Sequence, residues 1–452
     1  MRNRPLNCGK ILVLKANYPS HLLAAGSNAR GQLGIGSRDD AHTFTPCVFD
    51  GHGPQIPPNT LRIIGLASGA NHTVVLLQFQ DGDIQLWGAG DGSKGQLGPE
   101  CTVETMEDSM LVFRPLTPPL SELFQKKGLS YKCRLVAAAW ETTYIVFSCP
   151  GKSDILVSMG GNDFGALGVG VNTNTSNDPR IINLATVLND KAGATRPSTV
   201  SVKSIHAGPR HVVAELHMHL TDETSSRRVL VGWGASRHGQ LGQKTRTPCI
   251  DRPIMIPVDI ESDPLHSCAL GNEHTVILHQ SNRISALGSN RKGQLENLLN
   301  LKMYAEEIGC TWSGTYMHGR EGNQSILFAT GSNTKGQLGR RNTTAAGTDV
   351  IGAVELPARP SMDIIKFACG SEHVVVLTTR SEDKSNGVPN SVWGWGWNEH
   401  GNLGLGVSED IPRPTQLWPR DSSTSVGKVV VDVWAACGTS WLAVSASTGT
   451  TQ

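Results

Sequence analysis

The stretch VWGWGWNEHGNLGLG, residues 392–406, places three tryptophans and five glycines in fifteen positions. This composition fits a platform on which sugars stack, a glycine-rich loop that cradles phosphate, or one unit of an internal repeat. The three readings lead to different classes of protein. The rest of the chain decides between them.

The second half of this stretch recurs along the chain with the common form G-S-N-x-x-G-Q-L-G. The copies are GSNARGQLG from 26, GDGSKGQLG from 90, GGNDFGALG from 160, GASRHGQLG from 234, GSNRKGQLE from 288, GSNTKGQLG from 331 and GWNEHGNLG from 396. The outer glycines mark positions of positive φ or close backbone approach, and the leucine returns to the core. The opening stretch is therefore the seventh copy of a repeat.

A second motif alternates with the first. Its clear copies are ASGANHTVVLL from 67, HAGPRHVVAEL from 206, ALGNEHTVILH from 269 and ACGSEHVVVLT from 368, and its weaker copies are AAAWETTYIVF from 137, GCTWSGTYMHG from 309 and AACGTSWLAVS from 435. The β-branched runs in these copies are typical of buried strands. About sixty residues per unit accommodate four short strands, so seven units predict an all-β, seven-bladed propeller.

A closed ring must join its ends, so we expect strands from the N- and C-terminal segments to pair within one blade. The strand-like segments are KILVLK from 10 and LLAAG from 22 at one end, and VVVDVWAACGTSWLAV from 429 at the other. Helical periodicity is nearly absent. SELFQKKG from 121 and the region around AEE at 305 are the plausible short helices.

Composition narrows the class of function. Lys plus Arg total 40 and Asp plus Glu total 39, a net charge of +1, so strong direct binding of nucleic acid is not expected. No apolar run is long enough to cross a bilayer. The ten cysteines form no CxxC pair and no cluster with zinc-ligand spacing, which favours a reducing compartment over a disulfide scaffold. We therefore expect a cytoplasmic protein, with the nucleus as a second compartment, that holds no metal or cofactor of its own.

No catalytic constellation is present. His72, His211, His274 and His373 occupy the same position of the second motif, which indicates a structural role, tying a turn to the neighbouring blade through ring-nitrogen hydrogen bonds. No G-x-S-x-G, H-E-x-x-H or P-loop occurs. The GWGWNEHG segment from 394 lacks the βαβ context of a dinucleotide site. We therefore predict a protein that is not an enzyme.

The paired motifs resemble those of the regulator of chromosome condensation repeat family, whose members are seven-bladed propellers. The resemblance covers about residues 22–446 of a single domain that spans 1–452. Segments near 99–130, 171–200 and 340–360 lie outside it and are expected to be loop insertions.

Departures from the repeat resemble a narrower group, the fungal alpha-tubulin suppressor propellers counted among killer-toxin-insensitivity factors. The departures are W-E-T-T from 140, T-W-S from 311, G-S-E-H from 370, W-G-W-G-W-N-E-H-G-N from 393 and T-S-W from 439. This resemblance implies a heterodimer with a small CSL-type zinc-ribbon protein that carries electrons for diphthamide synthesis on elongation factor two. It further implies support of Elongator-dependent wobble-uridine modification in tRNA, with Elongator components as further partners.

Tryptophans and charged residues at turns are the candidates for the partner-binding site. Trp87, Trp233 and Trp393 are expected in blade cores, whereas Trp140, Trp312, Trp397 and Trp441 stand where small or polar residues are usual. For Trp140 and Trp312, an interface and local packing are equally good readings; for Trp397 the interface is favoured. Glu141, Glu273 and Glu372 share one step of the second motif and predict a mildly acidic face that suits a basic partner. The predicted site is Trp140, Glu141, Trp312, Glu372, Trp395, Trp397, Glu399 and His400.

The main alternative is a guanine-nucleotide exchange factor for a small Ran-like GTPase, which is the role of the family's founding member. Exchange requires a wedge that displaces nucleotide and magnesium, and the segment 171–200 has room for one. The absence of a long basic tail disfavours a chromatin role. A glycan-binding propeller is a weaker third reading that rests on the tryptophans alone.

Overall fold

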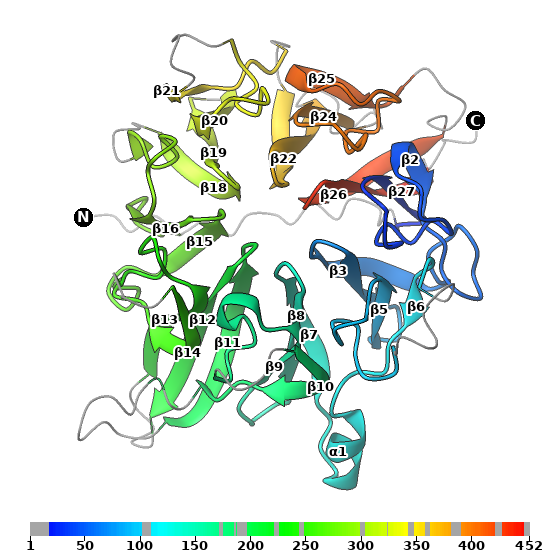
Figure 1. Ribbon diagram of the computed structural model, residues 1–452, viewed down its shortest axis with the longest axis vertical. Coiled ribbons are helices and arrows are strands. Elements are labelled where there is room, and N and C mark those ends of the chain that lie inside the picture. The colour runs from blue at the N-terminus through cyan, green and yellow to red at the C-terminus, as the bar shows by residue number, and fades with distance from the viewer. Residues whose placement is uncertain are drawn as a thin grey trace, which may run out of the picture.

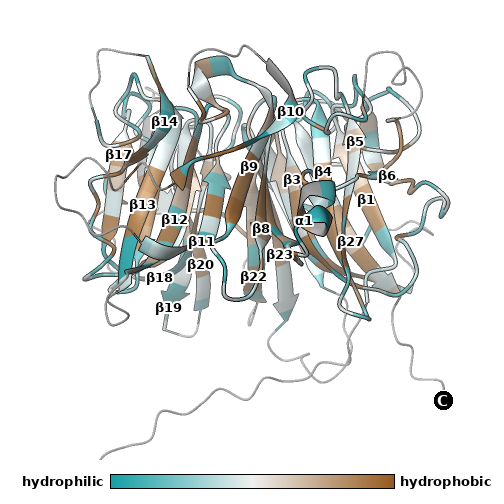
Figure 2. Cartoon of the chain, turned by 90° about the horizontal axis from the view of Figure 1, so that it is seen from below, coloured by the Kyte–Doolittle hydropathy of each residue, from teal (hydrophilic) through white to brown (hydrophobic). Residues whose placement is uncertain are grey.

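The computed structural model describes residues 18–101, 110–170, 175–184, 187, 197–220, 226–243, 248–298, 303–322, 324–341, 348–357, 362–380, 390–420 and 427–446. Seven antiparallel sheets are arranged around a central axis as the blades of a propeller (Figure 1). This confirms the predicted fold class. The side view in Figure 2 shows hydrophobic residues along the strands and hydrophilic ones in the loops at both faces.

Blade 1 joins the two ends of the chain, in the strand order β2-β1-β27-β26. Its strands are β1 (His21–Gly26), β2 (Ala41–Pro46), β26 (Lys428–Ala436) and β27 (Thr439–Ala446). The register of β1 against β27 runs from His21 opposite Val444 to Gly26 opposite Thr439. The predicted pairing of the termini is therefore confirmed for LLAAG, while the KILVLK segment lies outside the described residues.

The other six blades follow in chain order, each beginning with its innermost strand. Blade 2 comprises β3 (Thr60–Ser68), β4 (His72–Phe79), β5 (Ile84–Gly90) and β6 (Arg114–Pro115); blade 3, β7 (Lys132–Ala138), β8 (Thr142–Ser148), β9 (Ile155–Gly161) and β10 (Thr175–Ile181); blade 4, β11 (Pro197–Ala207), β12 (His211–Leu220), β13 (Ser226–Ala235) and β14 (Cys249–Met255). Blade 5 comprises β15 (Leu265–Leu270), β16 (His274–His279) and β17 (Ile284–Gly288); blade 6, β18 (Tyr304–Thr311), β19 (Gly314–Glu321), β20 (Gln324–Ser332) and β21 (Thr348–Ala353); blade 7, β22 (Met362–Cys369), β23 (His373–Arg380), β24 (Ser391–Gly396) and β25 (Ile411–Trp418).

The hydrophobic core consists of seven clusters, and each cluster lies between two neighbouring blades. The innermost strands β3, β7, β11, β15, β18, β22 and β26 contact one another in that order and close the ring around a central channel. A blade therefore buries its apolar faces only against its neighbours. Loss of one blade would expose two of the clusters.

Two expectations about local structure were wrong. The helix predicted at SELFQKKG is present as α1 (Ser121–Lys126), outside the ring (Figure 1), but AEE at 305 belongs to strand β18. Ala305 and Ile308 of β18 are both buried between blades. Residues three positions apart would face opposite sides of a regular strand, but the register shift between Ala305 and Glu307 turns both toward the core. The segments 99–130, 171–200 and 340–360 are not simply insertions, since they contain the outer strands β6, β10 and β21.

The repeated histidines join neighbouring blades, as predicted. Nε2 of the ring lies within 2.8–3.2 Å of a hydroxyl oxygen in the next blade, in the pairs His72 with Thr143, His211 with Thr275, His274 with Thr315 and His373 with Ser440. Each of the three threonine hydroxyls donates in turn to the carbonyl of Gln96, Gln240 or Gln294 in the first motif. Because the single hydroxyl proton is used there, the imidazole must donate through Nε2–H.

Two junctions use aromatic side chains instead. Blades 3 and 6 have Thr142 and Gly314 at the histidine position, and the blades that follow them have Val212 and Val374 at the hydroxyl position. There the first-motif carbonyl accepts two other donors. Tyr144 Oη and Trp233 Nε1 bond the carbonyl of Ala166 at 2.7 and 2.8 Å, and Tyr316 Oη and Trp395 Nε1 bond that of Gln337 at 2.6 and 2.8 Å. At these two junctions both histidine and hydroxyl are absent, whereas the junction of blades 1 and 2 has Thr439 at the histidine position and keeps the Thr73 hydroxyl, which donates to the carbonyl of Gln32.

The buried histidines make the ring sensitive to acid. Burial lowers the pKa of His72, His274 and His373 to about 4 and that of His211 to about 3. Protonation would place a second N–H at Nδ1, which has no hydrogen-bond acceptor in the described structure. The stabilising contribution of these groups is complete above pH 6.5 and is lost as the pH falls toward 4, because the unfolded chain then binds more protons than the folded chain.

We predict that His373→Gln reduces the steepness of this acid destabilisation. The glutamine amide keeps a donor for Ser440 but cannot titrate, so unfolding should take up roughly one proton fewer between pH 6.5 and 4 than in the unmodified protein. Denaturant unfolding at several pH values measures this slope. An unchanged slope would show that His373 is not held neutral in the folded state.

Candidate functional site

The candidate site is the mouth of the central channel, on the face where each inner strand turns into the next strand of its blade. We call the seven equivalent residues of these turns the mouth ring: Ala70, Trp140, Pro209, Asn272, Trp312, Ser371 and Cys437. Backbone hydrogen bonds link them from blade to blade. Ala70 N–H donates to Trp140, Trp140 N–H to Pro209 and Trp312 N–H to Ser371, at 2.8–3.1 Å.

Two tryptophans meet across the mouth. Trp140 comes from blade 3 and Trp312 from blade 6, yet their ring centroids lie 6.0 Å apart with the planes tilted by 45°. Trp140 is 39% exposed and Trp312 is half-buried. Because the other positions of the mouth ring carry smaller side chains, the two indoles can reach toward the axis. The structure thus brings together two residues that are 172 positions apart in the sequence, as a partly exposed aromatic pair.

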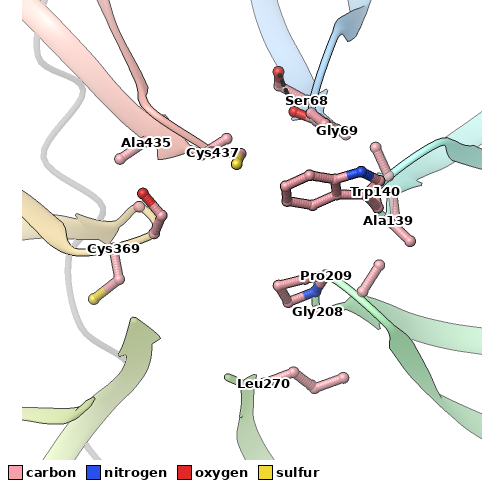
Figure 3. A pocket seen from close by; sticks show the side chains of 18 of the residues that line it. Ser68, Gly69, Ala139, Trp140, Gly208, Pro209, Leu270, Cys369, Ala435 and Cys437 are labelled. Carbon is pink, nitrogen blue, oxygen red and sulfur yellow. Dashed lines mark hydrogen bonds between the residues drawn. The ribbon is translucent and has the colours of Figure 1, made fainter. Parts of the chain in front are cut away.

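A cavity of about 270 Å³ lies in the channel beside this pair. Figure 3 shows the Trp140 indole extending into it, opposite Cys369, Ala435 and Cys437. Most of the lining is small and apolar, including Ala67, Ala138, Ala207 and Leu270. Cys369 and Cys437 are half-buried and also line this cavity.

The expected acidic face is not present. Glu141 forms an ion pair with Lys94 Nζ, and Glu273 lies 3.1 Å from His238 Nε2. Glu372 accepts a hydrogen bond from Gln337 Nε2, and burial raises its pKa to about 7. Each partner belongs to the first-motif loop of the preceding blade. Each of the three carboxylates is therefore engaged by a side chain of the preceding blade, and they do not form an open acidic surface for a basic partner.

Trp395 cannot contact a partner, which corrects the prediction for this residue. Its side chain is completely buried and takes part in the aromatic junction between blades 6 and 7. Trp233 occupies the equivalent place in blade 4 and is also fully buried. Trp87 and Trp393 are buried, as expected. Trp441 is also buried, so its unusual position in the repeat does not place it at the surface.

Trp397, Glu399 and His400 form a separate group at the junction of blades 7 and 1. Trp397 is half-buried, its Nε1 donates to Glu399 Oε2 at 3.2 Å, and its ring meets the His400 ring edge-on at 5.3 Å. His400 Nδ1 lies 2.7 Å from Asp40 Oδ2. The indole lies against Gly438, where other blades carry a longer side chain, so local packing accounts for the unusual tryptophan.

The sequence reading missed Phe164, a 42% exposed aromatic residue near Trp140. The repeat contains a signal for it. In the six other copies of the first motif, the residue before the G-x-L-G end is basic: Arg30, Lys94, His238, Lys292, Lys335 and His400. In the described part of the chain, no group of three or more His, Cys, Asp and Glu is placed to hold a metal ion. None of the described helices is long and apolar enough to cross a membrane.

Comparison with known proteins shows that four segments of the chain match a known repeat. Residues 21–76, 230–278, 326–377 and 390–443 match the regulator of chromosome condensation (RCC1) repeat. An RCC1 repeat-containing protein of Schizosaccharomyces pombe is 26% identical over 399 residues, which cover 86% of this chain and 91% of that protein. The ultraviolet-B receptor of Arabidopsis thaliana is 25% identical over 460 residues, covering 96% and 88%. A secretion-regulating guanine nucleotide exchange factor of Bos taurus is 27% identical over 424 residues, covering 87% and 78%.

Solved structures agree on the fold. Prp20p of Saccharomyces cerevisiae, reported with its binding to Gsp1p and histones, superimposes with a TM-score of 0.67 at 16% identity, covering 96% of this chain and 93% of that one. Human WBSCR16 gives a TM-score of 0.65 at 18% identity, covering 95% and 100%. At these identities the likeness concerns the fold alone.

We predict that Glu372→Gln stabilises the protein above neutral pH. A carboxyl whose folded pKa is raised to about 7 contributes stability that is complete below pH 4.5 and lost as the pH rises through 7. The variant should gain on the order of 2 kcal/mol of unfolding free energy at pH 8 and little at pH 5. Thermal unfolding at the two pH values tests this. Equal effects at both would contradict a buried, proton-binding Glu372.

Proposed function

We propose that this chain, an RCC1-repeat propeller, is a non-enzymatic interaction protein that binds a small CSL-type zinc-ribbon protein at its channel mouth. The observation that carries the proposal is the exposed pair of Trp140 and Trp312. Large, rigid aromatic side chains lose little entropy on burial and are enriched among residues that dominate binding energy. An exposed indole pair is costly in water unless a partner covers it.

The identity of the partner rests on the resemblance of the motifs. W-E-T-T from 140 and T-W-S from 311, which resemble those of the alpha-tubulin suppressor group, supply the two tryptophans of the pair. In this proposal the zinc-ribbon protein carries electrons for diphthamide synthesis on elongation factor two. The complex also supports Elongator-dependent modification of wobble uridine, in the cytoplasm or nucleus.

A second candidate is guanine-nucleotide exchange on a small Ran-like GTPase. It is favoured by the relative in Bos taurus that is named as an exchange factor. The region in which we expected a wedge, 171–200, includes strand β10, and residues 171–174, 185–186 and 188–196 lie outside the described structure. The proposed interaction and this activity differ in a measurable way, because only an exchange factor accelerates release of bound nucleotide.

We predict that Trp140→Ala combined with Trp312→Ala lowers affinity for a purified CSL-type zinc-ribbon protein by at least about thirtyfold, as loss of a central aromatic pair does. Isothermal titration calorimetry measures the affinity. Tyr304→Ala is the matched control, since Tyr304 is 60% exposed at the opposite end of the strand that leads to Trp312. It should leave the affinity unchanged.

Two results would contradict the proposal. One is the absence of binding between the unmodified propeller and the zinc-ribbon protein. The other is accelerated release of a fluorescent guanine nucleotide from a Ran-like GTPase by the same preparation, which would support the exchange-factor alternative. Binding that survives loss of both tryptophans would move the interface away from the channel mouth.

A further inference from the structure

On the channel-mouth face, three of the junctions between blades bring two particular residues into contact. One is the loop-tip residue of the first motif, and the other is the turn residue that follows the mouth ring in the next blade. At the junction of blades 2 and 3 these are Lys94 and Glu141, and at that of blades 4 and 5 they are His238 and Glu273. At the first junction the ammonium and carboxylate groups form an ion pair, and at the second the imidazole nitrogen lies 3.1 Å from the carboxylate.

Two junctions on one side of the mouth, that of blades 3 and 4 and that of blades 5 and 6, lack this pair of acid and base; the junctions of blades 1 and 2 and of blades 7 and 1 also lack the acid, with Asn71 and Gly438 at its position. Blade 4 carries Arg210 where the acid is expected, and the loop tip facing it is Phe164, so the guanidinium lies over the phenyl ring at 5.0 Å. Blade 6 carries Ser313 at the acid position, which leaves the exposed Lys292 of the preceding loop without a carboxylate. Neither junction neutralises its basic residue.

The result is a run of basic side chains along one side of the mouth, which we call the basic arc: Arg210, Arg237, Arg291 and Lys292. All four side chains are exposed. Among the described residues, no acidic side chain forms an ion pair with any of them. Lys292 still acts electrostatically on Glu372, which places its charge on the side of the mouth that contains Trp312.

Phe164, at the edge of the basic arc, has a strained backbone conformation and an exposed aromatic ring. Its φ and ψ are 58° and 20°, a left-handed conformation that non-glycine residues other than Asn and Asp rarely adopt, and its ring is 42% exposed. Strain of this kind costs on the order of 1 kcal/mol and gathers at functional positions. The other first-motif loops that the structure describes have no such residue at this position.

A second cavity, of about 170 Å³, lies between Phe164, Trp140 and Pro209. Arg210 lines it together with two carboxylates, Glu141, which forms an ion pair with Lys94, and Asp163, which acts electrostatically on the same lysine. A cavity of about 150 Å³ accommodates a benzene ring in a well-studied protein, so this one has room for a single apolar side chain. The site therefore offers an aromatic-walled pocket for one apolar group beside the Arg210 guanidinium, and the other residues of the basic arc lie outside the pocket lining, in the loops of the next two blades.

We propose that the basic arc and the Trp140–Phe164 pocket bind an acidic peptide segment that carries one apolar side chain. The apolar side chain enters the pocket and the flanking carboxylates pair with Arg210 and with Arg291 or Lys292. This inference rests on the proposed role as an interaction protein and adds the chemistry of the segment that is bound. A nucleic acid fits less well, because the arc is short, Glu273 interrupts it, and the chain's net charge is only +1.

The test uses the full-length protein and short acetylated peptides in which one Phe or Leu is flanked by Asp and Glu. Fluorescence polarisation should show saturable binding that weakens with salt and is lost in peptides with Gln and Asn in place of the acids. Arg291→Glu with Lys292→Glu should weaken binding at least about tenfold. Lys127→Glu, an exposed charge beside α1 at the outer edge of the ring, is the control and should have no effect.

Phe164→Asn separates binding from structure. Asparagine tolerates the left-handed conformation, so the variant should melt at a higher temperature than the unmodified protein while its affinity for the acidic peptides falls at least about fivefold. A purely structural Phe164 would not give these opposite changes. Absence of peptide binding, equal binding by the charge-reversed variant, or tighter binding of single-stranded oligouridylate would each overturn the inference.

The same proteins distinguish this inference from the proposed function. Capture of the zinc-ribbon protein by a propeller that binds no acidic peptide would overturn the inference alone. Specific binding of acidic peptides by a propeller that does not bind the zinc-ribbon protein would overturn the choice of partner and leave the peptide site standing.

Discussion

The donation from a neutral histidine to a hydroxyl of the next blade is the contact on which the ring depends. A blade of this size has no core of its own, and its buried residues pack only against its neighbours. The histidine fixes how one blade sits on the next, and through Thr143, Thr275 or Thr315 it holds the carbonyl of the preceding loop. The same few hydrogen bonds therefore fix the first-motif loop, the turn that carries the histidine and the orientation of one blade against the next.

At two of the junctions that lack this contact, histidine and hydroxyl are absent together, whereas the junction of blades 1 and 2 lacks only the histidine and keeps the Thr73 hydroxyl. Where valine replaces the hydroxyl, at Val212 and Val374, the preceding blade has no histidine, since an imidazole N–H without an acceptor would be costly to bury. Tyr144 with Trp233, and Tyr316 with Trp395, then satisfy the loop carbonyl. Blades 3 and 6, which precede these valines, are also the blades that carry Trp140 and Trp312.

Repeat spacing was enough to predict seven blades, the closure of the ring and the structural histidines, because these depend on residues recurring at fixed positions. The prediction of an acidic face was wrong because Glu141 and Glu273 are engaged by Lys94 and His238 of the preceding blades. This relation becomes visible only when the loop tip of one copy is aligned with the turn of the next. The prediction that Trp395 belongs to the partner-binding site was wrong because the sequence alone does not distinguish a buried tryptophan that donates to a loop carbonyl from an exposed tryptophan at a turn. The outer strands β10 and β21 were taken for insertions because TSNDPRI and TDVIGA lack a strong apolar alternation.

The mouth ring is where this fold can vary its surface at little cost. Backbone N–H and carbonyl groups of Ala70, Trp140, Trp312 and Ser371 are engaged with neighbouring blades, and these bonds do not depend on the side chain. A substitution there changes what the face presents without removing a bond that closes the ring. The same reasoning applies to the turn residues beside the ring, where Arg210 and Ser313 replace acids and create the basic arc. We therefore expect functional residues at positions where the backbone is held by hydrogen bonds to neighbouring blades and the side chain is free to differ.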